Sequence, residues 1–300
     1  MPFLIPLSLF SHYFSLFKKI YYNSTKKIKG YVIIQAKKKF GQNFLKDKSY
    51  LDKIIESMPN DENLIVEIGP GLGDLTEKLL QKNSLVAYEI DEDLCKILKD
   101  KFNDLELVCG DVLESWQTGR LREEKYNLIA NLPYYIATNI ILKALNDENC
   151  ENILVLIQKE VAEKFNAKVG EKIYSSLAII ASSVAKTEIK FDIPPSAFVP
   201  APKVISSVIL FKKFRPKYDE AFAKFLKVAF SQPRKTLLKN LSTKYEKKKI
   251  ENIFIQLGIQ KNIRPHQISK ELFFEVFSEL KGETKNDNDT TTNTKRDSKQ

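Results

Sequence analysis

The sequence of 300 residues predicts an α/β fold: a doubly wound, mostly parallel sheet, followed by a small region made only of helices. Three observations lead to this prediction. Short apolar runs bounded by polar turns alternate with helical segments in the first half of the chain. These runs are nearly continuous, which is typical of parallel strands that helices cover on both faces. After residue 214 only helical patterns remain.

Seven strands are expected, five from the first half of the chain and two from later segments. The expected strands are LIVEI (64–68), SLVAYEI (84–90), LELVCGDV (105–112), YNLIANL (126–132), NILVLIQ (152–158), KTEIKFDI (186–193) and KVISSVILFKKF (203–214). Helical segments such as DLTEKLLQK and EDLCKILKDKF separate the first four. The last expected helix, SKELFFEVFSEL, has Ser269 as a candidate N-cap and Gly282 as a stop.

Composition restricts the classes of chemistry. Apolar content of 43% and charged content of 29% are those of an ordinary globular protein. The three cysteines have no CxxC spacing, which predicts a reducing compartment and no disulfide framework. The two histidines, His12 and His266, lie near opposite ends of the chain, which argues against a zinc site or a histidine-based catalytic triad.

The net charge of +10 is distributed unevenly. Residues 1–46 hold nine lysines and no acid, residues 47–200 hold 17 basic and 27 acidic residues, and residues 201–281 hold 18 basic and seven acidic residues. Basic flanks around an acidic middle are typical of a catalytic body with polyanion-binding arms. Solvated lysine-rich helices would give the same distribution, and charge alone does not separate the two interpretations.

Four regions follow from these patterns: an N-terminal extension (1–36) that we expect to be poorly ordered, an α/β domain (37–213), a helical domain (214–281) and a disordered polar tail (282–300). The first 17 residues are uncharged but too short to span a bilayer comfortably. They suit a membrane-surface anchor, a targeting segment or an extension from a misassigned start codon, and we favour the last.

The first expected strand leads into VEIGPGLGDL, in which Gly69, Gly71 and Gly73 permit a tight turn close to a ligand. A dinucleotide fingerprint would need a glycine at position 74, where the chain has Asp74. A carboxylate at a helix start repels a pyrophosphate, which disfavours NAD and FAD. S-adenosyl-L-methionine suits the turn better, because it lacks a phosphate and its cationic sulfonium tolerates acids such as Glu67.

Two further acids end the next expected strands. Glu89 lies 20 residues after Gly69, where Rossmann-type sites place an acid on the ribose hydroxyls. Asp111, after the third strand, could accept a hydrogen bond from an adenine amino group. Acids at strand ends are also common helix caps. Their order at the ends of consecutive strands nevertheless favours one cofactor site at the carboxyl edge of the sheet.

The fourth strand delivers Asn131, Leu132, Pro133 and Tyr134 to the same edge. The Asn131 side-chain oxygen and the Leu132 carbonyl could hold the two N–H groups of an adenine amine, so that its lone pair faces a methyl donor. Pro133 would fix the main chain, and Tyr134 would stack on an extruded base. The alternative is an ordinary strand-to-helix turn with an Asn cap and packed tyrosines, which this four-residue combination makes the weaker interpretation.

From about residue 37 to residue 280 the chain resembles the ribosomal RNA adenine dimethyltransferase family, specifically the bacterial small-subunit enzyme. KKKFGQNFL resembles the N-terminal signature of the family, and Asn43 and Leu45 match its cofactor-contacting positions. EIGPGLG, YEID, GDV and NLPY match successive family motifs, as FVPAPKVISSV and AFSQPRKTLLKNL match later ones. The resemblance implies a Rossmann-like class I methyltransferase and carries cofactor roles to the following residues: Gly69, Gly71, Glu89, Asp111 and Asn131.

The resemblance also implies the substrate: two adjacent adenosines in the 3′-terminal hairpin loop of 16S rRNA, each dimethylated on N6 within a pre-30S particle. It implies a cytoplasmic monomer that needs no metal and no stable membrane association. Phe198 is a candidate for the second stacking face, although a buried phenylalanine beside prolines is a serious alternative. Lys203, Arg234 and Lys235 are candidate RNA contacts, with solvated surface charges as the alternative.

Two other functions remain open. A 23S rRNA methylase of the antibiotic-resistance type shares the glycine turn and an Asn-x-Pro-Tyr run, although FVPAPKV and PRKTLLKN favour the small-subunit enzyme. A non-catalytic RNA-binding assembly or transcription factor on the same scaffold could lose its cofactor contacts, yet Glu89, Asp111 and Asn131 are all present. The chain departs from the family pattern in its long N-terminal extension and in Tyr135, where many relatives have Asn.

Overall fold

The structure is a computed structural model that describes residues 3–6, 25–28, 31–34, 37, 40–116 and 119–282. Within the predicted extension, β1 (Phe3–Pro6), β3 (Tyr31–Ile34) and β2 (Thr25–Ile28) pair antiparallel in that order. The rest of the extension up to residue 36, and the predicted disordered tail after Gly282, lie outside the described residues.

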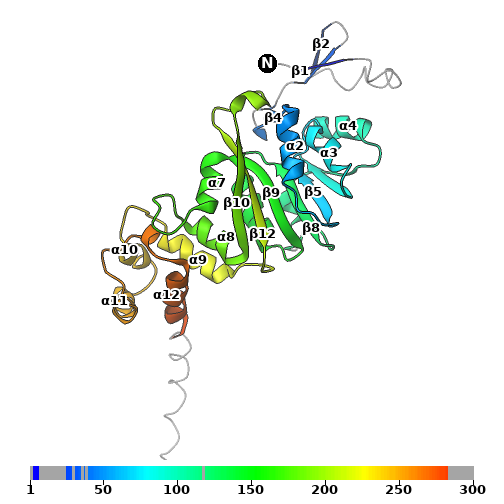
Figure 1. The fold of residues 1–300 in the computed structure, drawn as a ribbon. Helices are drawn as coiled ribbons and strands as arrows, with labels where there is room; N and C mark the ends of the chain where they lie inside the picture. The colour runs from blue at the N-terminus through cyan, green and yellow to red at the C-terminus, as the bar shows by residue number, and fades with distance from the viewer. Residues whose placement is uncertain are drawn as a thin grey trace, which may run out of the picture. The chain divides into compact units, whose positions relative to one another are not determined.

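The chain divides into two compact units: residues 1–159 with 189–210, and residues 160–188 with 211–300. One sheet has the order β10-β12-β9-β8-β5-β6-β7 (Figure 1), which confirms the expected α/β class with seven strands. The pairs β5–β6, β6–β7, β5–β8 and β8–β9 are parallel. Its strands are β5 (Leu64–Ile68), β6 (Leu85–Glu89), β7 (Glu106–Cys109), β8 (Tyr126–Asn131), β9 (Cys150–Gln158), β10 (Ala185–Ile193) and β12 (Ser206–Lys213).

The structure confirms the two helical segments named between the first strands, α3 (Asp74–Leu79) and α4 (Glu92–Lys101). The first unit also holds α2 (Lys48–Glu56), α5 (Val112–Ser115) and α6 (Ala137–Asn146). Three of all these helices begin with an aspartate N-cap, namely Asp47, Asp91 and Asp111. Each carboxylate accepts a hydrogen bond from the main-chain N–H two residues later, which satisfies a donor that the first turn leaves unpaired.

A separate two-stranded sheet, which the sequence does not predict, joins segments that are far apart in the sequence. β4 (Phe44–Leu45) pairs antiparallel with β11 (Phe198–Val199), with Leu45 opposite Phe198. Leu45 and Phe198 are both buried in the same apolar cluster as Ile65 and Ile129 of the main sheet. This pairing attaches the GQNFL segment to the sheet, and it uses the FVPAP segment to do so.

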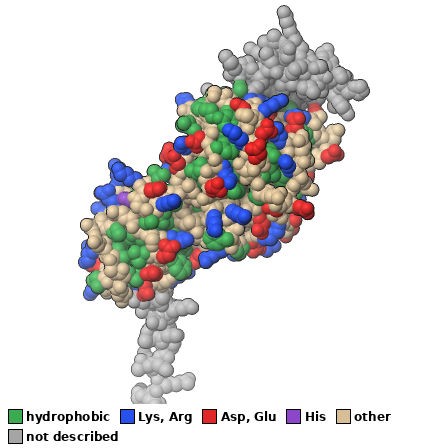
Figure 2. Space-filling model, in the orientation of Figure 1, with side chains coloured by type: hydrophobic (Ala, Val, Ile, Leu, Met, Phe, Trp, Pro, Cys, Tyr) green, Lys and Arg blue, Asp and Glu red, His purple; other side chains and the backbone are tan. Residues whose placement is uncertain are grey.

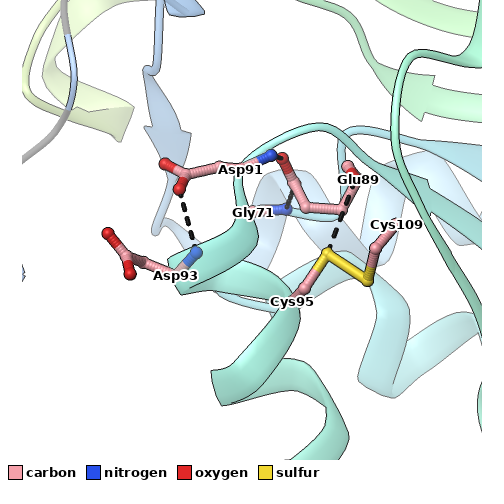
Figure 3. The surroundings of a disulfide bond; sticks show 6 residues. All are labelled: Gly71, Glu89, Asp91, Asp93, Cys95 and Cys109. Atoms are coloured by element: carbon pink, nitrogen blue, oxygen red, sulfur yellow. Dashed lines mark hydrogen bonds between the residues drawn. A yellow bond between two sulfur atoms is a disulfide. The ribbon is translucent and has the colours of Figure 1, made fainter. Parts of the chain in front are cut away.

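The expectation of no disulfide is wrong for two of the three cysteines. Cys95, on α4, is joined to Cys109, at the end of β7, with a Cα–Cα distance of 6.2 Å (Figure 3). The two residues lie 14 positions apart in the sequence, so spacing alone gives no CxxC signal. Parallel pairing of β6 with β7 and the return of the chain through α4 bring them together. Cys150 is buried and lies outside this bond.

The second unit holds α7 (Lys159–Asn166), α8 (Ser176–Val184), α9 (Glu220–Ala229), α10 (Leu237–Leu241), α11 (Lys247–Gln256) and α12 (Lys270–Gly282). Aromatic rings of α9 and α12 form its core, with the Phe222 and Phe277 ring centroids 5.3 Å apart. The buried Asn240 side chain donates to the carbonyls of Ala229, at 2.8 Å, and Gln232, at 3.1 Å, which fixes the loop between α9 and α10. In the described residues no helix is long and apolar enough to cross a membrane.

Candidate active site

A pocket of about 1050 Å³, counting its open mouth, lies in the first unit where strands of the sheet end. Ten of the predicted site residues line it: Asn43, Leu45, Gly69, Gly71, Glu89, Asp111, Asn131, Leu132, Pro133 and Tyr134. They come from the N-terminal segment and from the carboxyl ends of β5, β6, β7 and β8, the edge at which doubly wound sheets bind ligands. Residues far apart in the sequence thus meet in one cavity large enough for a nucleoside ligand.

The glycine turn after β5 needs its glycines for two reasons. Gly69 and Gly71 have φ of 71° and 61°, in the left-handed region that other residues rarely adopt. A Cβ on Gly71 would also lie 2.9 Å from the ring of Phe44, a distance that forces the ring or the turn to move. The turn is therefore shaped both by its own conformation and by the segment packed over it.

Glu89 ends β6 with both carboxylate oxygens engaged (Figure 3). Its Oε2 accepts from Gly71 N at 3.2 Å, and its Oε1 accepts from Asp91 N at 2.9 Å. The side chain is only 4% exposed. Burial raises the pKa of Glu89 to about 7, although the main-chain N–H groups of Asp91 and Gly71 favour the charged form.

Two more acids lie beside the turn. Glu67, on β5, is fully buried and accepts a hydrogen bond from the Thr76 hydroxyl at 2.7 Å. Burial, together with the nearby carboxylates of Glu89 and Asp74, raises the pKa of Glu67 to about 8, although the hydrogen bond from Thr76 opposes the shift. Asp74 begins α3 and pairs with the Lys46 ammonium at 2.5 Å. The acids around the turn disfavour a phosphate, whereas a cationic ligand would stabilise their ionised forms.

The position of Asp111 is compatible with both of the roles that the sequence leaves open. It caps α5 by accepting from Leu113 N at 2.9 Å, and it also lines the pocket. The cap fixes the carboxylate at the end of β7, where it remains within the cavity. A cap and a ligand contact are thus compatible at this residue.

The NLPY segment is held rigidly where β8 ends. The Asn131 side-chain nitrogen donates to the carbonyl oxygen of Asn43 at 3.0 Å. Leu132 N donates to Leu156 O on β9 at 3.1 Å, and the carbonyl of Pro133 accepts from Ile136 N at 3.1 Å. The Tyr134 hydroxyl lies 2.6 Å from the hydroxyl of Ser206 on β12, which fixes the position of the ring.

Four predicted residues lie outside the pocket. Phe198 is 2% exposed and packs in the apolar cluster, so in this conformation it presents no ring face to the cavity. Lys203 is exposed in the loop before β12, within the first unit. Arg234 and Lys235 are exposed just before α10, in the second unit. On the face shown in Figure 2, Lys and Arg side chains are scattered among Asp and Glu side chains.

Sequence reasoning missed most of one wall of the pocket. Residues 40–45 all line the pocket, and only Asn43 and Leu45 among them are predicted; the others are Phe40, Gly41, Gln42 and Phe44. Tyr135 is 61% exposed at the pocket, and a Cβ on Gly41 would lie 3.3 Å from its ring. Burial raises the pKa of Tyr135, and the carboxylates of Asp111 and Glu89 raise it further. The sequence signal for this wall is the KKKFGQNFL motif, from which only Asn43 and Leu45 are assigned to the site.

Comparison with known proteins decides the family. The sequence model described as "Ribosomal RNA adenine dimethylase" matches residues 33–282. The chain belongs to this family. It is 55% identical over 250 residues to the "Ribosomal RNA small subunit methyltransferase A" of Sulfurimonas denitrificans, a match that covers 81% of this chain and 93% of the relative. A protein of the same name from Aliarcobacter butzleri is 53% identical, covering 83% and 97%.

Solved structures of low identity share the fold. A dimethyladenosine transferase from Plasmodium falciparum superposes with a TM-score of 0.67 at 24% identity, covering 78% of this chain and 95% of that one. The 23S rRNA methyltransferase ErmE gives a TM-score of 0.62 at 24% identity, covering 79% and 99%. The predicted Rossmann-like methyltransferase fold and the predicted enzyme family are thereby confirmed.

Proposed function

We propose that this rRNA adenine dimethylase family member transfers methyl groups from S-adenosyl-L-methionine to N6 of two adjacent adenosines in the 3′-terminal hairpin loop of 16S rRNA. The curated relatives at 55% and 53% identity, both named for the small subunit, support this target. The observation that carries the chemistry is the convergence of Glu89, Asp111 and the NLPY segment in one pocket.

The pocket suits S-adenosyl-L-methionine, which when bound supplies a methyl group on a cationic sulfur. Glu89 would accept hydrogen bonds from the ribose hydroxyls, and Asp111 from the adenine amine. Gly69 and Gly71 would let the ligand approach the main chain, and Asn43 and Leu45 would contact it from the N-terminal segment that also lines the pocket. Glu67 and Glu89 are buried beside the turn, and a nearby sulfonium charge would favour their ionised forms.

The target amine is a poor nucleophile, because its lone pair is delocalised into the purine ring. The Asn131 side-chain oxygen and the Leu132 carbonyl accept its two N–H bonds, which localises the lone pair and directs it toward the methyl donor. Pro133 holds that carbonyl, and Tyr134 stacks on the extruded base. The nitrogen gains a methyl group and loses one proton, which leaves to solvent.

Two methyl transfers to one nitrogen make a further demand on the site. After the first transfer one N–H remains, so one acceptor must release while the pocket admits a methyl group. Acceptors that orient the nitrogen fulfil this demand better than a base that deprotonates it. Asn131 suits the role, since a neutral amide tolerates the loss of one hydrogen bond at modest cost.

RNA outside the pocket is held by phosphate contacts in this proposal. Exposed cations at Lys203, Arg234 and Lys235 are positioned on loops, where a flexible RNA can reach them. Phe198 as a second stacking face stays a prediction, and it requires the β11 segment to rearrange when RNA binds. The reaction needs no metal and no membrane, and we place a monomer on a pre-30S particle in the cytoplasm.

Methylation of isolated particles tests the proposal. Purified protein is incubated with pre-30S and 50S particles that lack the modification, together with S-adenosyl-L-methionine labelled on its methyl group. We expect label in 16S rRNA alone and N6,N6-dimethyladenosine in its nuclease digest. Label confined to 23S rRNA would identify an enzyme of the antibiotic-resistance type. RNA binding without methyl transfer or cofactor binding would indicate a non-catalytic assembly factor.

A further inference from the structure

One wall of the pocket is a short segment whose beginning is held by side chains and whose end pairs with β11. We call residues 40–46 the strap; six of its residues, 40–45, line the pocket. Its only strand, β4, is two residues long. Because this main-chain pairing is confined to the end of the strap, side-chain contacts decide how firmly its beginning closes the cavity.

At its beginning the strap is attached to the loop after β6. The Lys37 ammonium lies 2.6 Å from Asp91 Oδ1 and 2.7 Å from Asp93 Oδ2. Gln42 uses both ends of its amide: its nitrogen donates to Asp91 Oδ2 at 2.9 Å, and its oxygen accepts from Lys37 N at 2.8 Å. Two side chains thus converge on one carboxylate.

That carboxylate is also connected to the predicted ribose acid. Asp91 N donates to Glu89 Oε1, and Glu89 Oε2 accepts from Gly71 N in the glycine turn (Figure 3). A continuous chain of hydrogen bonds therefore runs from Lys37 and Gln42 through Asp91 to Glu89. Displacing Asp91 would disturb both the strap and the orientation of Glu89.

The far end of the strap is held by the main chain, because Lys46 N donates to Ala197 O at 2.9 Å beside the β4–β11 pairing. Lys46 pairs with Asp74 at 2.5 Å, but their side chains are 30% and 32% exposed, and exposed ion pairs contribute little. Asp91 is only 3% exposed, beside a Lys37 that is 28% exposed. A buried carboxylate that loses its partners is strongly unfavourable. Burial lowers the pKa of Lys37, but hydrogen bonds to Asp91 and Asp93 outweigh this and raise it, so the ammonium stays charged.

We propose that Lys37 and Gln42 are positioning residues for the cofactor: through Asp91 they hold the strap against the pocket and keep Glu89 oriented toward the ligand. The inference rests on the proposed use of this pocket for S-adenosyl-L-methionine. Lys37 does not line the pocket, and Gln42, which does, has both ends of its amide bonded to Lys37 and Asp91. The effect of Lys37 and Gln42 is on the affinity of the site and leaves the methyl-transfer step itself unchanged.

Calorimetric titration with S-adenosyl-L-methionine, without RNA, tests this role. Lys37→Met and Gln42→Leu should each raise Kd about tenfold, the effect of one charge-assisted hydrogen bond. At saturating cofactor, kcat should stay within about twofold of that of the unmodified chain. The variants lose binding energy that is the same in the ground state and in the transition state, so the methyl-transfer step is not slowed. Lys48→Met removes the same charge from an exposed side chain at the start of α2, and it should leave both Kd and kcat unchanged.

Rescue and coupling separate positioning from a general loss of stability. Lys37→Arg should restore affinity to within about threefold, since a guanidinium can pair with the same carboxylates. The effects of Lys37→Met and Asp91→Asn should not add, because each removes the same contact. Hydrogen exchange should be faster in residues 40–46 of Lys37→Met and unchanged in β5 and β6.

The outcomes distinguish this inference from the proposed function. If the unmodified chain binds no cofactor, the proposed function fails before the variants are compared. If it binds and methylates while Lys37→Met and Gln42→Leu bind equally well, the positioning role is overturned. The same holds if affinity falls but exchange accelerates across the whole unit, or if kcat falls as much as affinity.

Discussion

The side-chain nitrogen of Asn131 donates a hydrogen bond to the main-chain oxygen of Asn43, 3.0 Å away. The bond to a carbonyl identifies that atom as the amide nitrogen, so the side-chain oxygen is the atom left to accept hydrogen bonds. The hydrogen bond between Asn131 and Asn43 joins the end of β8 to the strap, across 88 positions of sequence. The amide that the mechanism needs as an acceptor is therefore oriented before any substrate arrives.

Replacing this amide should affect chemistry more than cofactor binding. Asn131→Ala should cut methyl transfer about 100-fold, the loss expected for one preorganised polar contact. Affinity for S-adenosyl-L-methionine should fall by no more than about tenfold, since Glu89 and Asp111 are unchanged and only the bond from Asn131 to the strap is lost. Single-turnover methylation of pre-30S particles and calorimetry measure the two quantities. Unchanged turnover would mean that another group orients the amine.

Cofactor affinity should depend on pH through Glu89. Burial raises the pKa of Glu89 to about 7, so the carboxyl is protonated below that pH and ionised above it. Only the ionised form accepts two ribose hydrogen bonds together with those from Gly71 and Asp91. Affinity should therefore rise about tenfold per pH unit up to pH 7 and then level off. Calorimetric titrations between about pH 5.5 and 8.5, a range that brackets this pKa, measure the change in affinity.

Glu89→Gln is the control, because it removes the titration while keeping the size of the side chain. The cofactor affinity of this variant should be low and should no longer rise with pH through the ionisation of residue 89. Only the smaller effect of Glu67 should remain, because burial raises the pKa of Glu67 to about 8. The raised pKa of Glu89 makes folding stability change with pH in the opposite direction to cofactor affinity. Between the ordinary pKa of 4.5 and the folded value, the unfolded chain holds fewer protons, so the contribution of Glu89 to stability falls as pH rises.

The sequence predicts the strands and the pocket residues that follow them, because both are local. Apolar runs read directly as buried strands, and the ends of parallel strands meet at one edge whatever their lengths. Glu89, Asp111 and Asn131 could therefore be assigned to one pocket without coordinates. Gly71 is a further case, since its positive φ follows from the turn itself.

Contacts between distant segments could not be predicted in this way. The pairing of Leu45 with Phe198 joins strands of two residues each, too short to give a periodic pattern. It also explains why Phe198 is buried where a stacking role would need it exposed. The Cys95–Cys109 bond depends on the spatial return of α4 beside β7, and the partners of Lys37 depend on how the strap folds back.

A buried polar cluster offers a test of the fold independent of the pocket. Asp147 Oδ2 accepts from Trp116 Nε1, Leu121 N and the Tyr126 hydroxyl, each at 2.8 Å. Asp147→Ala would leave these buried donors without this acceptor and should lower the free energy of unfolding by about 3 kcal/mol or more. Urea denaturation measures the change.

The neighbouring acid provides the matched control for this variant. Glu148 pairs with Arg120 at the surface, and Glu148→Ala should change stability by less than about 1 kcal/mol. Equal losses in the two variants would contradict the view that Asp147 organises the loop before β8. A large loss in Asp147→Ala alone would support it.

RNA binding should depend on the exposed pair before α10. Reversing Arg234 and Lys235 to Glu should weaken binding of the 16S hairpin and reduce the salt dependence of log Kd by about one to two units, as expected when one or two phosphate contacts are lost. Cofactor affinity should not change, because the pocket lies in the other unit. The equivalent reversal of Lys247 and Lys248, exposed on α11, changes net charge equally. If both pairs reduce the salt slope alike, the effect is general attraction to RNA; a loss confined to Arg234 and Lys235 means direct contact.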